Sequence, residues 1–264
     1  DPYRKDPYLQ QWTLSVEREL PGSMLLSTAY VGSKGTHMFK RMNYNVARPG
    51  TTPMAARLPF PDFGGIINDK AIGASKYHAL QIDLNKRTSY GVSYRLGYTW
   101  SRSMDMGEDQ NFSYAPWNTR LDWRRSKFDF RHRLVYSGVY ELPIGAGKPF
   151  LNALPKAGNV LVQGWQISGI GTFQSGVALD VSGRDLTNSQ AGLYGARVNR
   201  SCNGTIPAGQ RTRDKWFDTS CFAEPPVGVF ANGGMGILDG PGTINWDLSL
   251  GKSTRITEKI NFQL

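Results

Sequence analysis

The sequence predicts an all-β fold, in which about eight antiparallel strands form part of a larger up-and-down transmembrane β-barrel. Three observations predict this fold. Apolar and polar residues alternate over stretches of about ten residues, the connections between these stretches alternate between short and long, and Tyr and Trp gather at the ends of the apolar faces.

The alternation is clearest between residues 90 and 101. The intervening positions hold Gly, Ser, Arg and Thr, so a strand would separate the two sets of side chains, whereas a helix would mix them. One face of this strand would carry Tyr90, Val92, Tyr94, Leu96, Tyr98 and Trp100. The same pattern predicts strands within 11–17, 80–85, 133–142, 165–173 and 246–250, and more weakly within 24–31 and 256–264.

The connections carry a second, independent pattern. Tight turns are expected near 20–23, 87–91 and 252–257, where Gly, Ser and Thr suit turns. Long links are expected over about 32–75, 102–127 and 176–243. Short and long connections in alternation are typical of outer-membrane barrels, which have tight periplasmic turns and long extracellular loops.

The link over 143–162 has an intermediate length. It contains the run Pro-Ile-Gly-Ala-Gly-Lys-Pro, from which we expect an irregular periplasmic excursion. This link fits the barrel scheme less well than the other connections.

Aromatic residues at the ends of the apolar faces predict an aromatic girdle, because amphipathic rings prefer the membrane interface. The girdle would contain Trp12, Tyr30, Trp100, Tyr140, Trp165 and Trp246. A soluble sugar-binding β-sandwich would also alternate, but it rarely has such long connections on one side only. The sequence has no run of eighteen apolar residues, so a transmembrane helix is not expected.

The direction of the strands bears on the extent of the barrel. The first strand precedes a tight turn and so runs toward the periplasm, while the eighth would run outward. We therefore expect residues 1–264 to be a partial barrel domain, cut at both ends, that lacks a plug and other N-terminal domains. Open edge strands in lipid would leave unpaired backbone groups, so the segment needs neighbouring strands.

Charge and cysteine content point to the cell surface. The net charge of +10 is dispersed along the chain, so we expect contact with outer-membrane lipid and anionic lipopolysaccharide and no binding of nucleic acid. Cys202 and Cys221 lie in a segment rich in Gly, Asn and Ser. They would form one loop-closing disulfide in an oxidising compartment, the alternative being two unrelated thiols.

Several sequence motifs, in order along the chain, resemble the barrel of Oar-like TonB-dependent outer-membrane receptors. Examples are Gly-Trp-Gln-Ile-Ser-Gly at 164–169 and Phe-Asp-Phe-Arg-His-Arg at 128–133. The other matching segments are 6–12, 16–22, 29–37, 98–103, 240–242 and 245–249. This resemblance implies a barrel of many more strands, a plug inside it, and energy supplied by the TonB complex through an N-terminal region that this sequence does not contain.

No catalytic or cofactor motif emerges, so we expect neither an enzyme nor a cofactor. The alternation assigns Arg95, Arg131, Arg133 and Glu141 to the lumen. The arginines could attract an anionic substrate, or they could pair with acidic neighbours or the plug.

The leading functional hypothesis is a receptor wall that takes up or transports a large, unknown solute across the bacterial outer membrane. The alternative is a surface or adhesion barrel whose long loops bind a partner.

Overall fold

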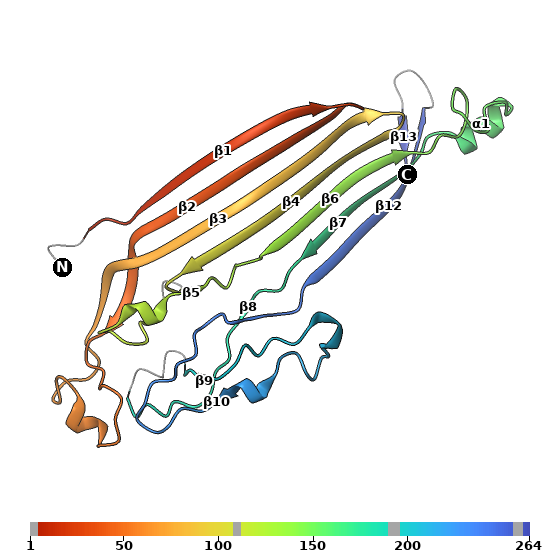
Figure 1. Ribbon diagram of the computed structural model, residues 1–264. Coiled ribbons are helices and arrows are strands. Elements are labelled where there is room, and N and C mark those ends of the chain that lie inside the picture. Colours follow the sequence, from red (N-terminus) through yellow and green to blue (C-terminus); the bar gives the residue numbers. More distant parts are fainter. Residues whose placement is uncertain (1–4, 108–111, 190–195, 256–260) are drawn as a thin grey trace.

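The computed structural model describes residues 5–107, 112–189, 196–255 and 261–264. Its main sheet is antiparallel and up-and-down, because each long strand pairs with the next long strand along the chain (Figure 1). The order in the sheet is β1 (Tyr8–Leu20), β2 (Met24–Asn43), β3 (Ile67–Ser89), β4 (Val92–Asp105), β6 (His132–Glu141), β7 (Trp165–Gln174), β12 (Thr243–Arg255) and β13 (Asn261–Gln263). The predicted fold class is confirmed.

Shorter elements lie in the connections. They comprise β5 (Arg124–Arg125), which pairs with β4; β8 (Ala178–Leu179) with β11 (Leu238–Asp239); β9 (Asn199–Arg200) with β10 (Phe222–Ala223); the α-helix α1 (Lys156–Val162); and 3-10 turns at Met54–Arg57, Thr119–Asp122, Ala208–Gln210 and Thr219–Cys221. Among the described residues, none of the helices has the length and apolar character needed to cross a membrane.

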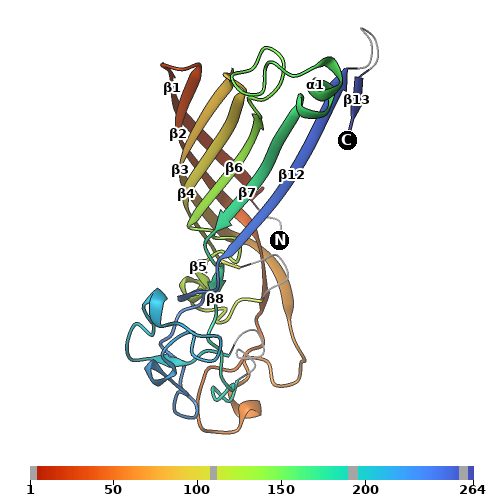
Figure 2. The ribbon, with the colours of Figure 1, turned by 90° about the vertical axis from the view of Figure 1, so that its right-hand side faces the viewer.

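The two ends of the sheet differ as predicted (Figures 1 and 2). Tight turns and α1 lie at one end, and the long loops lie at the other. The turn between β3 and β4 has only two residues, Tyr90 and Gly91, whose φ angles are 52° and 76°. Positive φ at both positions is the geometry of a type I′ hairpin turn, which matches the twist of paired strands. Tyr90 is therefore 99% exposed in the turn, and the expectation that it begins the strand was wrong.

The long strands β2 and β3 extend farther than the alternation indicates. They stay paired to Asn43 and Ile67, so the loop between them covers only 44–66, not 32–75. The alternation fails there because the register shifts between Gly35 and Phe39, and a bulge exchanges the faces of the residues that follow it. Polar residues beyond the bulge hid the continuation of both strands.

Two further boundaries differ from the expectation. The link over 143–162 ends in helix α1, which starts after Pro155; a helix of seven residues is too short to show helical periodicity. Strand β12 continues to Arg255, so residues 252–255 of the expected turn at 252–257 belong to a strand, and the rest of that turn lies outside the described residues. The eighth strand, expected over 256–264, is described only as β13 and pairs with Ser253–Arg255 of β12.

The buried core lies mainly in the loops and only to a small extent in the sheet. We define the loop cap as the described residues of 44–66, 106–131 and 175–242. Most of the buried apolar side chains belong to it: Val46, Ala47, Tyr114, Ala115, Ala178, Val198, Ile206, Cys221 and Leu238. The long loops therefore pack on one another as a unit below the sheet (Figure 2).

Candidate functional site

One face of the main sheet is apolar and open. The strand register places Leu14, Leu80, Leu96 and Leu248 on this apolar face. Leu14 is 71% exposed and Leu248 is 75% exposed. Soluble proteins rarely expose a contiguous apolar surface of this kind, because each buried methylene would gain about 0.8 kcal/mol. The apolar face is therefore suited to contact with lipid.

The six predicted girdle residues all lie on the apolar face, in two groups. One group consists of Trp12, Tyr30, Trp100 and Trp246, of which all but Tyr30 lie in the loop-cap halves of their strands, and the other consists of Tyr140 and Trp165 at the opposite ends of β6 and β7. Each of the first four is at least 41% exposed. Two groups of aromatic rings separated by aliphatic side chains match the two interfaces of a bilayer.

Some of these rings cover glycines on the neighbouring strand. A Cβ atom on Gly32 would lie 2.2 Å from the Trp12 ring, and one on Gly171 would lie 2.8 Å from the Trp246 ring. Glycine is needed at both positions because the ring occupies the space of a side chain. Such aromatic–glycine pairs fix the register of adjacent strands.

The structure also brings each histidine beside an aromatic residue, which the scattered sequence positions did not reveal. Tyr30 Oη and His78 Nδ1 are 2.7 Å apart, and Tyr98 Oη and His132 Nδ1 are 2.8 Å apart. The rings of Tyr8 and His37 meet edge to face, with centroids 5.6 Å apart. The cross-strand register creates these pairs, so no local sequence signal could identify them.

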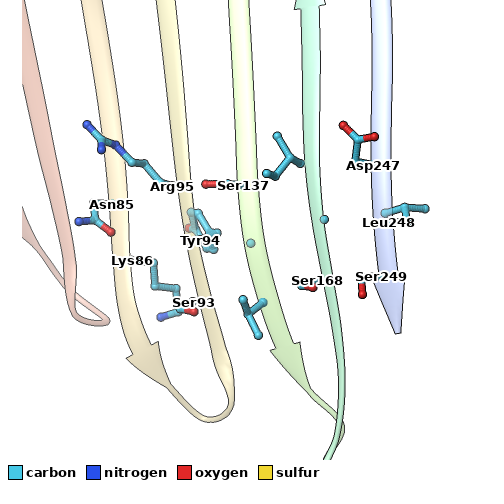
Figure 3. Close-up of a pocket in the computed structure, with 14 residues that line it drawn as sticks. Asn85, Lys86, Ser93, Tyr94, Arg95, Ser137, Ser168, Asp247, Leu248 and Ser249 are labelled. Carbon is cyan, nitrogen blue, oxygen red and sulfur yellow. The ribbon is translucent and has the colours of Figure 1, made fainter. Parts of the chain in front are cut away.

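The opposite face of the sheet is polar and hollowed. One hollow of about 510 Å³ crosses β3, β4, β6, β7 and β12, and a second of about 490 Å³ lies nearer β1 and β2. Figure 3 shows the side chains of Asn85, Arg95, Ser137, Ser168 and Asp247 around the first hollow. This face offers hydrogen-bonding groups and charges of both signs, which suits a water-filled lumen.

The four predicted lumen residues have different surroundings. Arg95 Nε lies 2.7 Å from Asp83 Oδ2 on the adjacent strand, and Lys148 Nζ lies 3.3 Å from Glu141 Oε2. Arg133 is on the polar face of β6, whereas Arg131 precedes β6 and its carbonyl accepts a hydrogen bond from Ser101 N. Among the described residues, neither Arg131 nor Arg133 has an acidic partner within ion-pair distance.

A buried arginine joins two loops of the loop cap. Arg125 Nε donates to Asp129 Oδ2 at 2.8 Å, and Arg125 Nη1 donates to Asp239 Oδ1 at 2.6 Å. Burial by itself would lower the pKa of Arg125, but its hydrogen bonds to Asp129 and Asp239 outweigh burial and raise it. Arg125 is thus a permanent cation that connects segments 114 residues apart.

Other contacts complete the loop cap. Cys202 and Cys221 form a disulfide with a Cα–Cα distance of 5.0 Å. Asn188 Nδ2 donates to the carbonyl oxygens of Gly50 and Thr52 and so ties the first loop to the third. The rings of Tyr114 and Phe230 pack with centroids 4.9 Å apart. A disulfide, hydrogen bonds and ring contacts thus give the long loops a defined conformation.

Comparison with known families identifies one match. A family model described as "Outer membrane beta barrel domain" matches residues 1–264. Comparisons with curated proteins and with solved structures gave no match. The family model covers the apolar face, the polar face and the loop cap alike. The chain therefore belongs to the outer membrane beta barrel domain family and is located in the bacterial outer membrane.

Proposed function

We propose that this chain forms part of the wall of a TonB-dependent receptor that takes up or transports a large solute across the outer membrane. The observation that carries the proposal is the open sheet with a hollowed polar face. Barrels of eight strands are just wide enough for side chains to fill their interior. Here the described sheet is not closed, and hollows of about 510 and 490 Å³ line its polar face.

The unpaired edges of the described sheet are a second argument that the sheet belongs to a wider barrel. One side of β1 has no paired strand among the described residues, and β13 pairs only with β12. Unpaired backbone groups in lipid cost several kcal/mol each, so both edges need neighbouring strands. The motif resemblance supports the narrower proposal that the TonB complex supplies energy to this barrel. The two aromatic belts support outer-membrane lipid and lipopolysaccharide as partners of the apolar face.

The alternative function is a surface or adhesion barrel, and the loop cap favours it. Its buried core and disulfide give the extracellular end a preformed shape. A preformed surface binds a partner with less loss of conformational entropy than flexible loops do. In this alternative the barrel anchors the loop cap, and no solute passes through it.

Growth experiments separate the two functions. A strain that lacks this gene and a strain that lacks TonB would be compared across a panel of iron, glycan and peptide sources. For a receptor we expect both strains to lose growth on the same source, and the cloned gene to restore it only when TonB is present. Unchanged growth on every source, with altered attachment of cells to surfaces or to each other, would overturn transport and support the adhesion barrel.

A further inference from the structure

A cavity of about 210 Å³ lies where the loop cap meets the end of the sheet. We define it as the basic cavity. Its charged lining consists of Lys40, Arg124, Lys127 and Arg197 with Asp122 and Asp180. We propose that the basic cavity binds a small oxyanion, namely a phosphate or carboxylate group.

The charge of the lining supports an anion. Even without Lys127, three cationic side chains of the lining face two carboxylates, and both carboxylates already accept hydrogen bonds. Asp122 accepts from Ser113 Oγ at 2.5 Å and from Tyr114 N at 2.8 Å. Asp180 Oδ1 accepts from Gly236 N at 2.6 Å. The two aspartates therefore leave an excess of positive charge in the cavity.

Unused donors point to the same ligand. Within the described part of the chain, Arg124 Nη2 and Arg197 Nε are buried and have no hydrogen-bond partner. Arg124 Nη2 does lie 3.1 Å from Asp180 Oδ2, as an ion pair without hydrogen-bond geometry. Both arginines are only 7% exposed. A buried donor without a partner is unfavourable, and more so when it is charged, so an accepting oxygen beside either atom would stabilise this arrangement.

Two contacts hold the guanidinium of Arg197 in place. Its Nη2 donates to the Leu121 carbonyl at 2.6 Å, and its guanidinium lies 4.2 Å from the centroid of the Tyr114 ring. These contacts fix the orientation of Nε. Burial lowers the pKa of Arg197, with neighbouring Arg124 contributing in the same direction. A bound anion would offset this electrostatic cost.

The volume limits the ligand. A cavity of about 210 Å³ has room for a phosphate or a short carboxylate together with several waters. The inference goes beyond the proposed function and does not depend on it, because an adhesion barrel would keep the same cavity.

Titration of the intact protein in detergent tests the proposal. Inorganic phosphate, sulfate and acetate would be added in separate calorimetric titrations, in a buffer of low ionic strength. We expect one saturable site and a rise of the melting temperature with ligand concentration, because binding to the folded state stabilises it. Preference for phosphate and sulfate would assign a tetrahedral ligand, and preference for acetate would assign a carboxylate.

One arginine variant of the cavity and one control variant locate the site. Arg197→Met keeps an apolar stem against Tyr114 and should weaken binding at least tenfold. Arg184→Gln removes a positive charge from an exposed ion pair of the loop cap and should bind as the wild type does. Arg124→Gln replaces Arg197→Met if the latter fails to fold, as judged by heat-modifiable migration on gels. Absence of saturable binding to folded wild-type protein, or equal affinity in the folded arginine variant, would overturn the proposal.

Discussion

The main sheet and the loop cap are stabilised in opposite ways. The sheet has few buried side chains, exposes aliphatic and aromatic residues on one face, and is held by cross-strand hydrogen bonds. The loop cap buries its own apolar core together with ion pairs and a disulfide. The difference reflects two solvents, because lipid surrounds the sheet whereas water surrounds the loop cap and drives burial there.

Among the substitutions considered, replacement of Arg125 should destabilise the loop cap most. Arg125→Met leaves the fully buried Asp129 without its cationic partner, and breaking a buried ion pair costs about 3–5 kcal/mol. We expect protease to cleave the loops while the sheet keeps its heat-modifiable migration. Arg184→Gln is the matched control with an exposed pair. Loss of the folded barrel in Arg125→Met would contradict the independence of the two regions.

A charged side chain placed on the apolar face of the sheet should destabilise the protein in lipid. Leu248→Arg, near the middle of β12, should lower the free energy of unfolding in lipid vesicles by about 2–4 kcal/mol. Ser249→Arg is the control, because the next residue along the strand points to the polar face. Tryptophan fluorescence during denaturant unfolding measures both variants. Equal costs for the two variants would mean that the faces are wrongly assigned.

The disulfide should stabilise the loop cap alone. Replacing both Cys202 and Cys221 by alanine opens a loop with a sequence separation of 19, which costs about 3 kcal/mol. We expect faster proteolysis between the two positions and an unchanged melting transition of the sheet. A matching loss of sheet stability would show that the two regions unfold together.

The smallest effect should come from the exposed pair Arg184–Glu224. A hydrogen bond from Arg184 lowers the pKa of Glu224 below its ordinary value of 4.5. The contribution of the ionised Glu224 side chain to the stability of the folded state is therefore complete above about pH 4.5. This contribution is lost as the pH falls through the lower pKa that Glu224 has in the folded state. We expect the difference in melting temperature between wild type and Glu224→Gln to shrink as pH falls from 6 to 3. A difference that grows on acidification would contradict this assignment.

Particular residues show which structural features the local sequence predicts and which it does not. The alternation around Leu96 and Trp100 predicts both the strand and its faces, because side chains of a strand alternate with a period of two. The sequence did not predict the bulge near Gly35, because a bulge interrupts the alternation of side chains. It did not predict helix α1 either, because a helix of this length is too short to show a periodic signal. The cation–carboxylate network of the loop cap also escaped, because Arg125 and Asp239 are 114 residues apart.

The sequence by itself determined the long strands, their apolar and polar faces and the alternation of turns and loops. These properties depend on neighbours within one strand or one turn, so the order of residues is enough to define them. Only the tertiary structure decided which rings cover glycines, where the histidines lie, and how the long loops enclose the basic cavity. Those features require cross-strand register and contacts between distant loops, which arise only when the chain folds as a whole.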